Sequence, residues 1–196
     1  MGEKLFLKSD RCYSPKCNLL RRPSKPGQAK KSRRGRTMSE YGRQLSEKQK
    51  LKLAYGINER QLSRYFHEAS RAKGLTGEIL LKKLEMRLDN MVFRMGFAGS
   101  RRVARQMVSH GHFLVNGKRT RVASFELKKG DLVQIRAQSI GKGIFRDLKE
   151  NMKKYQAPSY IILDLERIEG RVKGELTMSE LNPPFNMSLI VEFYSK

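Results

Sequence analysis

The dipeptide Asn116-Gly117 constrains this chain more than any other feature, because it fixes where a β-hairpin must turn. Asn and Gly are the residues that best tolerate the positive φ angles of a two-residue type I′ turn. Phe113 and Val115 alternate before the dipeptide and basic residues follow it, as two strands around a tight turn require. Residues 113–120 are therefore predicted to form a hairpin.

A helix and a third strand flank this hairpin. Ser100 can cap a helix whose apolar face holds Val103 and Met107 and which ends near Gly111, while alternation over 132–135 predicts the strand. Three arginines stand on the other face of the helix, close to its start. The free N–H groups and the positive dipole end of the helix already attract anions, and the three arginines strengthen this attraction. We therefore favour a phosphate-binding site over a merely solvated surface.

Further helices are predicted before this region. A narrow apolar stripe with a broad basic face begins at Ser39, and the capping-box spacing of Asn58 and Gln61 opens a second helix that stops at Gly74. From Leu80 to Met95 apolar residues recur at steps of three and four. This pattern leaves open one long helix or two joined end to end.

The remaining pattern predicts one more helix and further strands. The helix runs from Ile144 to Tyr155, a strand covers 161–165, and Gly170 and Gly174 punctuate a hairpin. Apolar residues alternate over 189–193, which predicts a final strand.

Residues 1–36 hold twelve Lys or Arg residues, two acidic residues and several Pro and Gly. Such a segment cannot bury enough apolar surface to fold by itself, and we expect an arm that becomes ordered on RNA. The alternative is a solubilising tail. The many arginines of this segment favour the RNA-binding arm over the tail, because Arg binds phosphate with two donors and stacks on bases.

The whole chain carries 42 Lys and Arg against 19 Asp and Glu, a formal net charge of +23, so a polyanion is its expected partner. An anionic membrane is the rival, but no stretch approaches the roughly 20 apolar residues that span a bilayer, and the start lacks a signal-peptide core. We expect a cytoplasmic protein. Two cysteines are too few for a disulfide scaffold.

The sequence contains no recognisable catalytic arrangement. It lacks a Ser-His-Asp pattern, a glycine-rich phosphate loop and a metal-ligand cluster, and none of its three histidines has an evident partner. We therefore expect no enzyme and no small-molecule substrate. Asp89 with Asn90 is the one polar pair of interest, and it is predicted to join two domains by hydrogen bonds.

Several motifs resemble one family. The chain resembles the RNA-binding module named after ribosomal protein S4 in Arg87-Leu88-Asp89-Asn90, Gly96-Phe97, Ser100-Arg101-Arg102 and the run from His110-Gly111-His112 to Val115-Asn116-Gly117. Similar modules occur in pseudouridine synthases, some aminoacyl-tRNA synthetases and a heat-shock RNA-binding protein. The remaining motifs resemble the ribosomal protein family itself: Cys12-Tyr13-Ser14-Pro15-Lys16-Cys17, Arg22-Pro23, Pro26-Gly27-Gln28, Ser39-Glu40-Tyr41-Gly42, Glu47-Lys48-Gln49-Lys50 and Val191-Glu192-Phe193-Tyr194-Ser195.

The resemblance implies an α+β fold with a discontinuous, mainly helical first domain. The S4-type module, two helices plus a small twisted sheet, is inserted into it. The implied divisions are a basic arm at 1–38, a helical domain at 39–86 with 176–196, and a domain at 87–175 that contains the module at about 87–136.

The resemblance also implies a structural role in the small ribosomal subunit of a bacterial-type ribosome. The implied partners are 16S-type rRNA at a five-helix junction, ribosomal protein S5 and other small-subunit proteins, and mRNA where it enters the subunit. The implied effects are early subunit assembly, translational accuracy and, in some bacteria, repression of the protein's own mRNA. A scaffold and an mRNA-binding regulator stay open together, whereas an RNA-modifying enzyme would need a catalytic domain.

The chain departs from the family near its start. Many bacterial relatives have a further cysteine pair before the matched segment, and the four cysteines bind a structural zinc. Cys12 and Cys17 supply half of such a site, so we expect no zinc and no other cofactor unless the first pair is present. Ala29 also stands where the family commonly has His.

The residues expected to bind rRNA are basic or polar and lie in four places. They are, in the arm, Arg11, Lys16, Arg21, Arg22, Lys25, Lys30, Lys31, Arg33, Arg34 and Arg36; in the helical domain, Arg43, Lys48, Lys50, Lys52, Arg60 and Arg64; in the module's helix, Ser100, Arg101, Arg102 and Arg105; and around the hairpin, His110, His112, Lys118 and Arg119.

Overall fold

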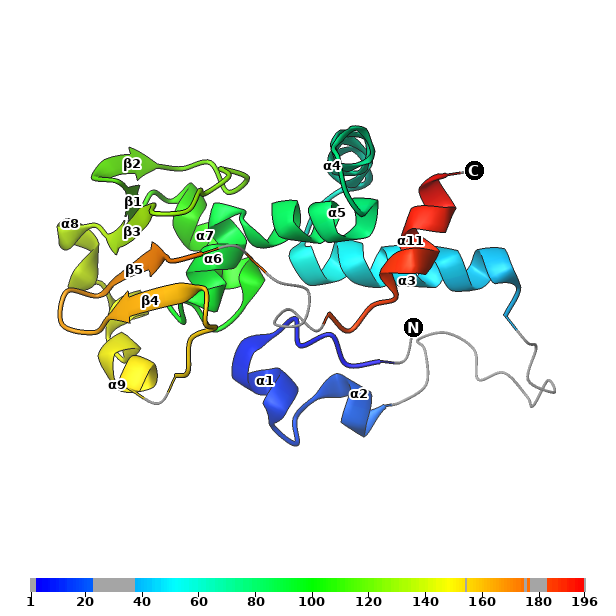
Figure 1. The fold of residues 1–196 in the computed structure, drawn as a ribbon. Helices are drawn as coiled ribbons and strands as arrows, with labels where there is room; N and C mark the ends of the chain where they lie inside the picture. Colours follow the sequence, from blue (N-terminus) through cyan, green and yellow to red (C-terminus); the bar gives the residue numbers. More distant parts are fainter. Residues whose placement is uncertain (1–2, 23–37, 154, 175, 177–182, 196) are drawn as a thin grey trace. The chain divides into compact units, whose positions relative to one another are not determined.

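The computed structural model describes residues 3–22, 38–153, 155–174, 176 and 183–195. The chain divides into two compact units, Met1–Leu80 with Pro183–Lys196, and Leu81–Asn182. The first is helical and the second combines helices with an antiparallel sheet (Figure 1), so the predicted α+β class is confirmed. No helix in the described ranges is long and apolar enough to cross a membrane.

The first unit is helical, and its two longest helices begin with side-chain caps. Its elements are α1 (Ser9–Tyr13), α2 (Asn18–Arg21), α3 (Glu40–Tyr55), α4 (Glu59–Arg71), the start of α5 (Thr76–Glu85) and α11 (Met187–Tyr194). The Ser39 hydroxyl accepts from the Gly42 N–H, and the Asn58 amide oxygen accepts from the Gln61 N–H at 2.8 Å. These contacts confirm the two predicted helix starts, because they satisfy backbone donors that the first turn leaves open.

The predicted strand at 189–193 is wrong, since α11 occupies this position. Asn186 caps the helix by accepting from the Leu189 N–H. Alternating residues also match a helical spacing here, because Met187, Ile190 and Tyr194 recur at steps of three and four. Ile190 is fully buried, and α11 packs against α3 within this unit (Figure 1). Packing on α3 therefore decides between two patterns that a short segment satisfies equally.

The second unit places helices beside a five-stranded sheet. Its elements are the end of α5, α6 (Leu88–Arg94), α7 (Arg101–Ser109), β1 (Phe113–Val115), β2 (Lys118–Thr120), β3 (Leu132–Ile135), α8 (Ala137–Ile140), the 3-10 helix η1 (Gly143–Phe145), α9 (Leu148–Lys153), β4 (Ile161–Asp164) and β5 (Glu169–Val172). The strand order is β2-β1-β3-β5-β4, and every neighbouring pair is antiparallel. The core includes Leu84, Leu88, Met91, Phe113 and Val133, all fully buried.

The predicted hairpin and third strand are confirmed. Asn116 and Gly117 have φ angles of 50° and 77°, as a type I′ turn requires. β1 pairs with β2 on one side and with β3 on the other.

The apolar stripe from Leu80 to Met95 forms two helices rather than one. The chain leaves helical geometry at Arg87, whose φ and ψ are −65° and 139°. Outside helical geometry, Arg87 forms an isolated bridge with Glu126, and its buried guanidinium pairs with Asp89 at 2.6 Å. This interruption separates α6 from α5 and allows Arg87 to pair with Asp89.

Two local predictions in this unit need correction. The hairpin expected around Gly170 and Gly174 is formed by β4 and β5, but Gly170 lies inside β5 rather than in the turn. A Cβ at Gly170 would come within 2.6 Å of the Met95 sulfur, so glycine permits this close approach. The apolar spacing from Ile144 to Tyr155 gives a 3-10 turn and the short α9 instead of one helix.

Candidate nucleic-acid interface

The start of α7 carries the arginine cluster that the sequence singled out. The Ser100 hydroxyl accepts from the Val103 N–H at 3.4 Å and caps the helix, and Ser100 itself is buried. Arg102 is exposed and has no salt-bridge partner among the described residues. Arg105 is half-buried. Ser100 thus shapes the helix start, and Arg102 presents its charge to solvent.

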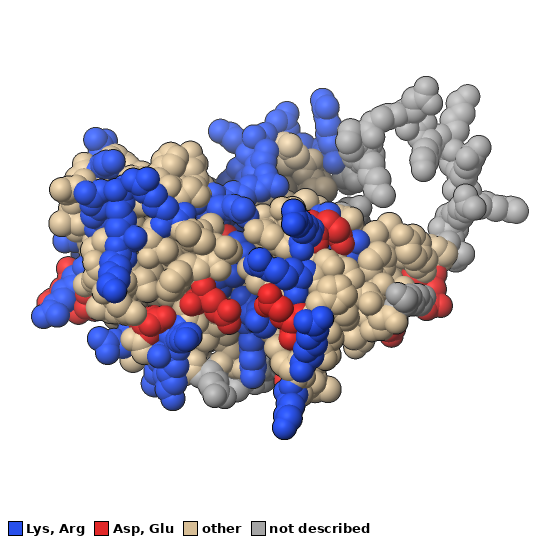
Figure 2. Space-filling view, turned by 90° about the horizontal axis from the view of Figure 1, so that it is seen from above, with Lys and Arg blue, Asp and Glu red and all other residues tan. Residues whose placement is uncertain are grey.

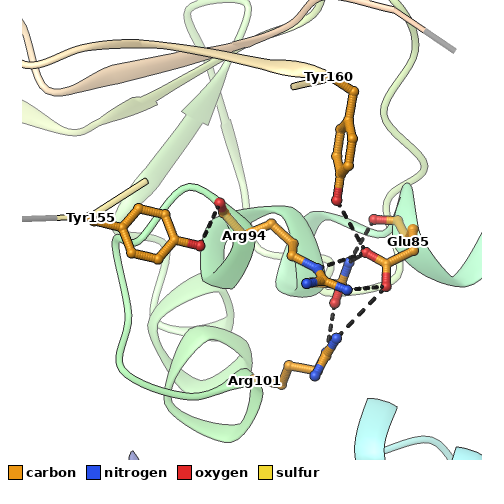
Figure 3. Close-up of polar contacts among 6 residues, drawn as sticks. Glu85, Arg94, Arg101, Tyr155 and Tyr160 are labelled. Carbon is orange, nitrogen blue, oxygen red and sulfur yellow. Dashed lines mark hydrogen bonds and ion pairs between the residues drawn. The ribbon is translucent and has the colours of Figure 1, made fainter. Parts of the chain in front are cut away.

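Arg101 has different surroundings, because its side chain points into a polar network around Glu85 (Figure 3). Its Nε donates to the Asn90 Oδ1 at 2.6 Å, and its Nη2 lies 3.7 Å from the Glu85 Oε1. Its guanidinium also lies over the Phe93 ring, 4.8 Å from the centroid. Arg101 therefore holds α7 to α6 and to the end of α5.

Glu85 is the centre of this network and is 1% exposed. Arg94 donates to its two oxygens from Nη2 at 2.8 Å and from Nε at 3.0 Å, and the Asn90 amide donates at 2.6 Å. Tyr160 donates its hydroxyl at 3.5 Å (Figure 3). Burial and the nearby Glu85 charge raise the pKa of Tyr160 well above its usual value, so the hydroxyl stays protonated. A buried carboxylate is tolerated because it is surrounded by donors.

Asp89 and Asn90 were predicted to join two domains by hydrogen bonds, and the bond from Asn90 to Glu85 does cross the implied boundary between residues 86 and 87. The Asp89 carboxylate receives two hydrogen bonds from Arg87, and the Asn90 side chain connects Glu85 with Arg101. All of these residues belong to the second unit.

The hairpin presents cations on the side of the C-terminal end of α7. Lys118 and Arg119 are exposed. The Arg119 guanidinium donates to the carbonyl oxygens of Gly111 at 3.2 Å and His110 at 3.4 Å, which lie just beyond the helix. A Cβ on Gly111 would meet this guanidinium at 2.5 Å, so glycine permits the contact. A positive charge is also favourable here, because the C-terminal end of α7 carries the negative end of the helix dipole.

His112 is buried, unlike its exposed neighbour His110. Its Nδ1 lies 3.0 Å from the Ser139 hydroxyl oxygen, and its ring packs edge-on against Phe145. Burial, and then the charges of Lys142, His110, Arg119 and Arg136, lower the pKa of His112. Arg136 and Lys142 were not among the predicted site residues. Both lie beyond the hairpin in sequence: the strand register brings Arg136 to His112, and the turn that follows β3 brings back Lys142.

Two lysines of α3 that were predicted to bind RNA are held by acidic and aromatic side chains. Lys48 is buried, donates to Glu59 at 2.9 Å and lies over the Phe193 ring at 4.1 Å from the centroid. Lys52 donates to the other oxygen of Glu59 at 3.2 Å. Burial opposes ionisation of Glu59, but hydrogen bonds from Lys48, Tyr194 and Lys52 outweigh it and lower the pKa of Glu59 to about 2. This ion cluster helps to fix α11 and α4 on α3.

Lys50 is likewise buried, and its Nζ lies 2.7 Å from carboxylate oxygens of both Glu3 and Glu47. Burial lowers the pKa of Lys50, but its hydrogen bonds to these two acids raise it above the usual value overall. Because its charge is balanced by these two carboxylates, Lys50 contributes to the fold and is poorly placed to bind a phosphate.

Other predicted cations of the first unit are exposed. Arg43 and Arg60 have no salt-bridge partner in the part of the chain that the structure describes, whereas Arg64 pairs with Glu68 at 3.6 Å. In the arm, Arg11, Lys16, Arg21 and Arg22 are exposed. Lys25, Lys30, Lys31, Arg33, Arg34 and Arg36 lie outside the described residues. Figure 2 shows blue Lys and Arg side chains standing out across the visible face, with fewer red acidic ones.

The cysteines do not provide a complete metal site. Cys17 is buried and Cys12 is partly exposed, with its sulfur accepting from the Lys8 N–H at 3.3 Å. Among the residues that the structure describes, no group of three or more His, Cys, Asp or Glu could hold a metal ion. Cys12 and Cys17 supply two of the four ligands that a structural zinc site requires.

Comparison with known proteins gives matches over the whole chain. Residues 1–85 match the family described as "Ribosomal protein S4/S9 N-terminal domain", and residues 86–133 match the "S4 domain". The chain is 49% identical over 195 residues to the "Small ribosomal subunit protein uS4" of Natranaerobius thermophilus, which covers 100% of this chain and 93% of that protein. It is 47% identical, with the same coverage, to proteins of Clostridium novyi ("uS4A") and Caldicellulosiruptor bescii ("uS4").

Proposed function

Because the chain belongs to the family of small ribosomal subunit protein uS4, we propose that it is a structural, RNA-binding constituent of the small ribosomal subunit. Its place in the cell would then be the cytoplasmic ribosome. It would act by binding and shaping RNA rather than by catalysis, and it would need no cofactor, no membrane and no small-molecule substrate.

The observation that carries this proposal is the set of exposed cations around α7 and the hairpin. Arg102 and Lys118 have no acidic partner among the described residues, and Arg119 donates to backbone oxygens instead of to a carboxylate. Folded RNA displays phosphates and 2′-hydroxyls and hides its base edges in a deep groove, so such cations suit recognition of its backbone and shape.

The RNA partner in this proposal is 16S-type rRNA at its five-helix junction, bound early in assembly. The family resemblance supports further contacts with ribosomal protein S5 and with mRNA where it enters the subunit, together with an effect on decoding accuracy. Binding to the protein's own mRNA, as a translational repressor, would use the same basic surface.

The test is binding of the purified chain to a five-helix-junction RNA and to a scrambled RNA of equal length, at several salt concentrations. Phosphate contacts give affinity for both RNAs that falls steeply with salt, whereas shape recognition favours the junction. A preference for the junction that persists at moderate salt is expected. Equal binding to both RNAs, abolished by salt, would refute the scaffold function.

A further inference from the structure

One end of the sheet gathers cations that come from separate segments. β1 begins where β2 and β3 end, because Phe113 pairs with both Thr120 and Ile135. The residues that directly flank these three positions emerge at the same end: His112, Arg121 and Arg136. The Arg136 N–H donates to the His112 carbonyl oxygen at 2.9 Å, which fixes the two segments side by side.

The chain then folds back over this end and adds Lys142. The Ser139 N–H donates to the Arg136 carbonyl oxygen at 2.7 Å, and the Lys142 N–H donates to the Ser139 carbonyl oxygen at 3.0 Å. The Ser139 hydroxyl meanwhile contacts the His112 ring at 3.0 Å. Arg119 reaches the same region from β2, where its guanidinium is held by the carbonyl oxygens after α7. Short hydrogen bonds therefore assemble this end of the sheet.

These cations act on one another rather than on acids. Loss of hydration, and then the charges of Arg121 and Arg136, lower the pKa of Arg119, as neighbouring positive charges must. Within the described ranges, none of Arg119, Arg121, Arg136 and Lys142 belongs to a salt bridge. Like charges brought together without acids disfavour the free protein, and an anion that binds among them removes this repulsion.

We propose that Arg119, Arg121, Arg136 and Lys142 form a binding site, the sheet-end site, for consecutive phosphates of an RNA backbone. The inference rests on the proposed RNA-binding function and adds Arg121, Arg136 and Lys142 to its contacts. Several cations from different segments match a run of phosphates better than a single carboxylate, and Arg can donate to phosphate with two parallel N–H groups. The buried His112 ring contacts the Ser139 hydroxyl and thereby helps to hold the segment that carries Arg136 and Lys142.

The decisive experiment compares two double variants in binding to the five-helix-junction RNA across a range of salt. The test variant is Arg136→Gln with Lys142→Gln. The matched control is Lys128→Gln with Lys129→Gln, which removes two exposed charges just before β3, at the opposite end of the strand. The test variant should bind about tenfold more weakly at low salt and lose roughly 1.4–1.8 from the log–log salt slope. The control should lose less than half as much.

Folding and local geometry are checked without RNA. The test variant should unfold at the same temperature as the wild type or higher, because it relieves repulsion. The pKa of His112, followed by NMR of its ring protons, should rise in the test variant and stay unchanged in the control. An unchanged pKa in the test variant would show that the cations do not surround His112, and would overturn the site.

The outcomes separate this site from the broader function. Failure of the wild type to prefer the junction RNA would overturn the proposed function. If the wild type prefers the junction but both double variants lose affinity equally, or neither loses any, the sheet-end site alone is overturned. In the supported case, adding RNA to the wild type also raises the pKa of His112, because phosphates neutralise the surrounding cations.

Discussion

Replacing Glu85 with Gln tests whether the buried network holds the second unit together. The variant keeps the shape of the side chain but removes the charge that two arginines share. Breaking a buried ion pair commonly costs about 3–5 kcal/mol, because a charge is left buried without its partner. Arg94 and Arg101 are 27% and 21% exposed, so water can partly solvate them, and we expect a loss of about 2–3 kcal/mol.

The assay is equilibrium unfolding in urea at neutral pH, with thermal unfolding as a second measure. A loss of this size corresponds to a fall of about 4–12 °C for a chain of this length. Glu166→Gln is the matched control, because Glu166 is an exposed acid of the same unit outside the network, and it should change stability by less than about 0.5 kcal/mol. A Glu85→Gln effect as small as the control's would show that the buried charge of Glu85 contributes nothing to stability.

Three further predictions follow from the contacts. Arg102→Gln should lower the salt slope of RNA binding by about one without changing stability, whereas Arg101→Gln should lower stability and leave the slope nearly unchanged; salt titrations and unfolding of both variants check this. The lowered pKa of Glu59 makes its stabilisation complete above its ordinary value of 4.5 and progressively lost as pH falls toward about 2, so Glu59→Gln should flatten the pH dependence of the urea midpoint in that window. Gly170→Ala should destabilise by about 1–3 kcal/mol in urea unfolding, because its Cβ would meet the Met95 sulfur; no change would mean that Met95 moves aside.

Features fixed by neighbouring residues could be predicted from the sequence. The turn at Asn116-Gly117 and the caps at Ser39 and Asn58 depend on contacts within four residues, and all three are confirmed. The final segment could not be predicted, because alternation and helical spacing coincide there and packing on α3 decides.

The surroundings of single cations were harder to predict. The sequence shows that Lys48 is basic, but its partners Glu59 and Phe193 come from other helices. The same holds for Arg101, whose inward direction depends on Glu85. For Arg136 the strand register had to be known first. Sequence therefore located the basic segments, whereas the fold decides which charges remain available to a ligand.

The strand order β2-β1-β3-β5-β4 also bears on solubility. The match to the S4 domain ends at residue 133, so β5 and β4 lie beyond it and cover the side of β3 that β1 leaves open. A strand with unpaired N–H and C=O groups is a template for pairing with another chain. The β4–β5 hairpin thus shields β3 from such pairing, and a chain shortened before Ile161 would expose an apolar edge that promotes aggregation.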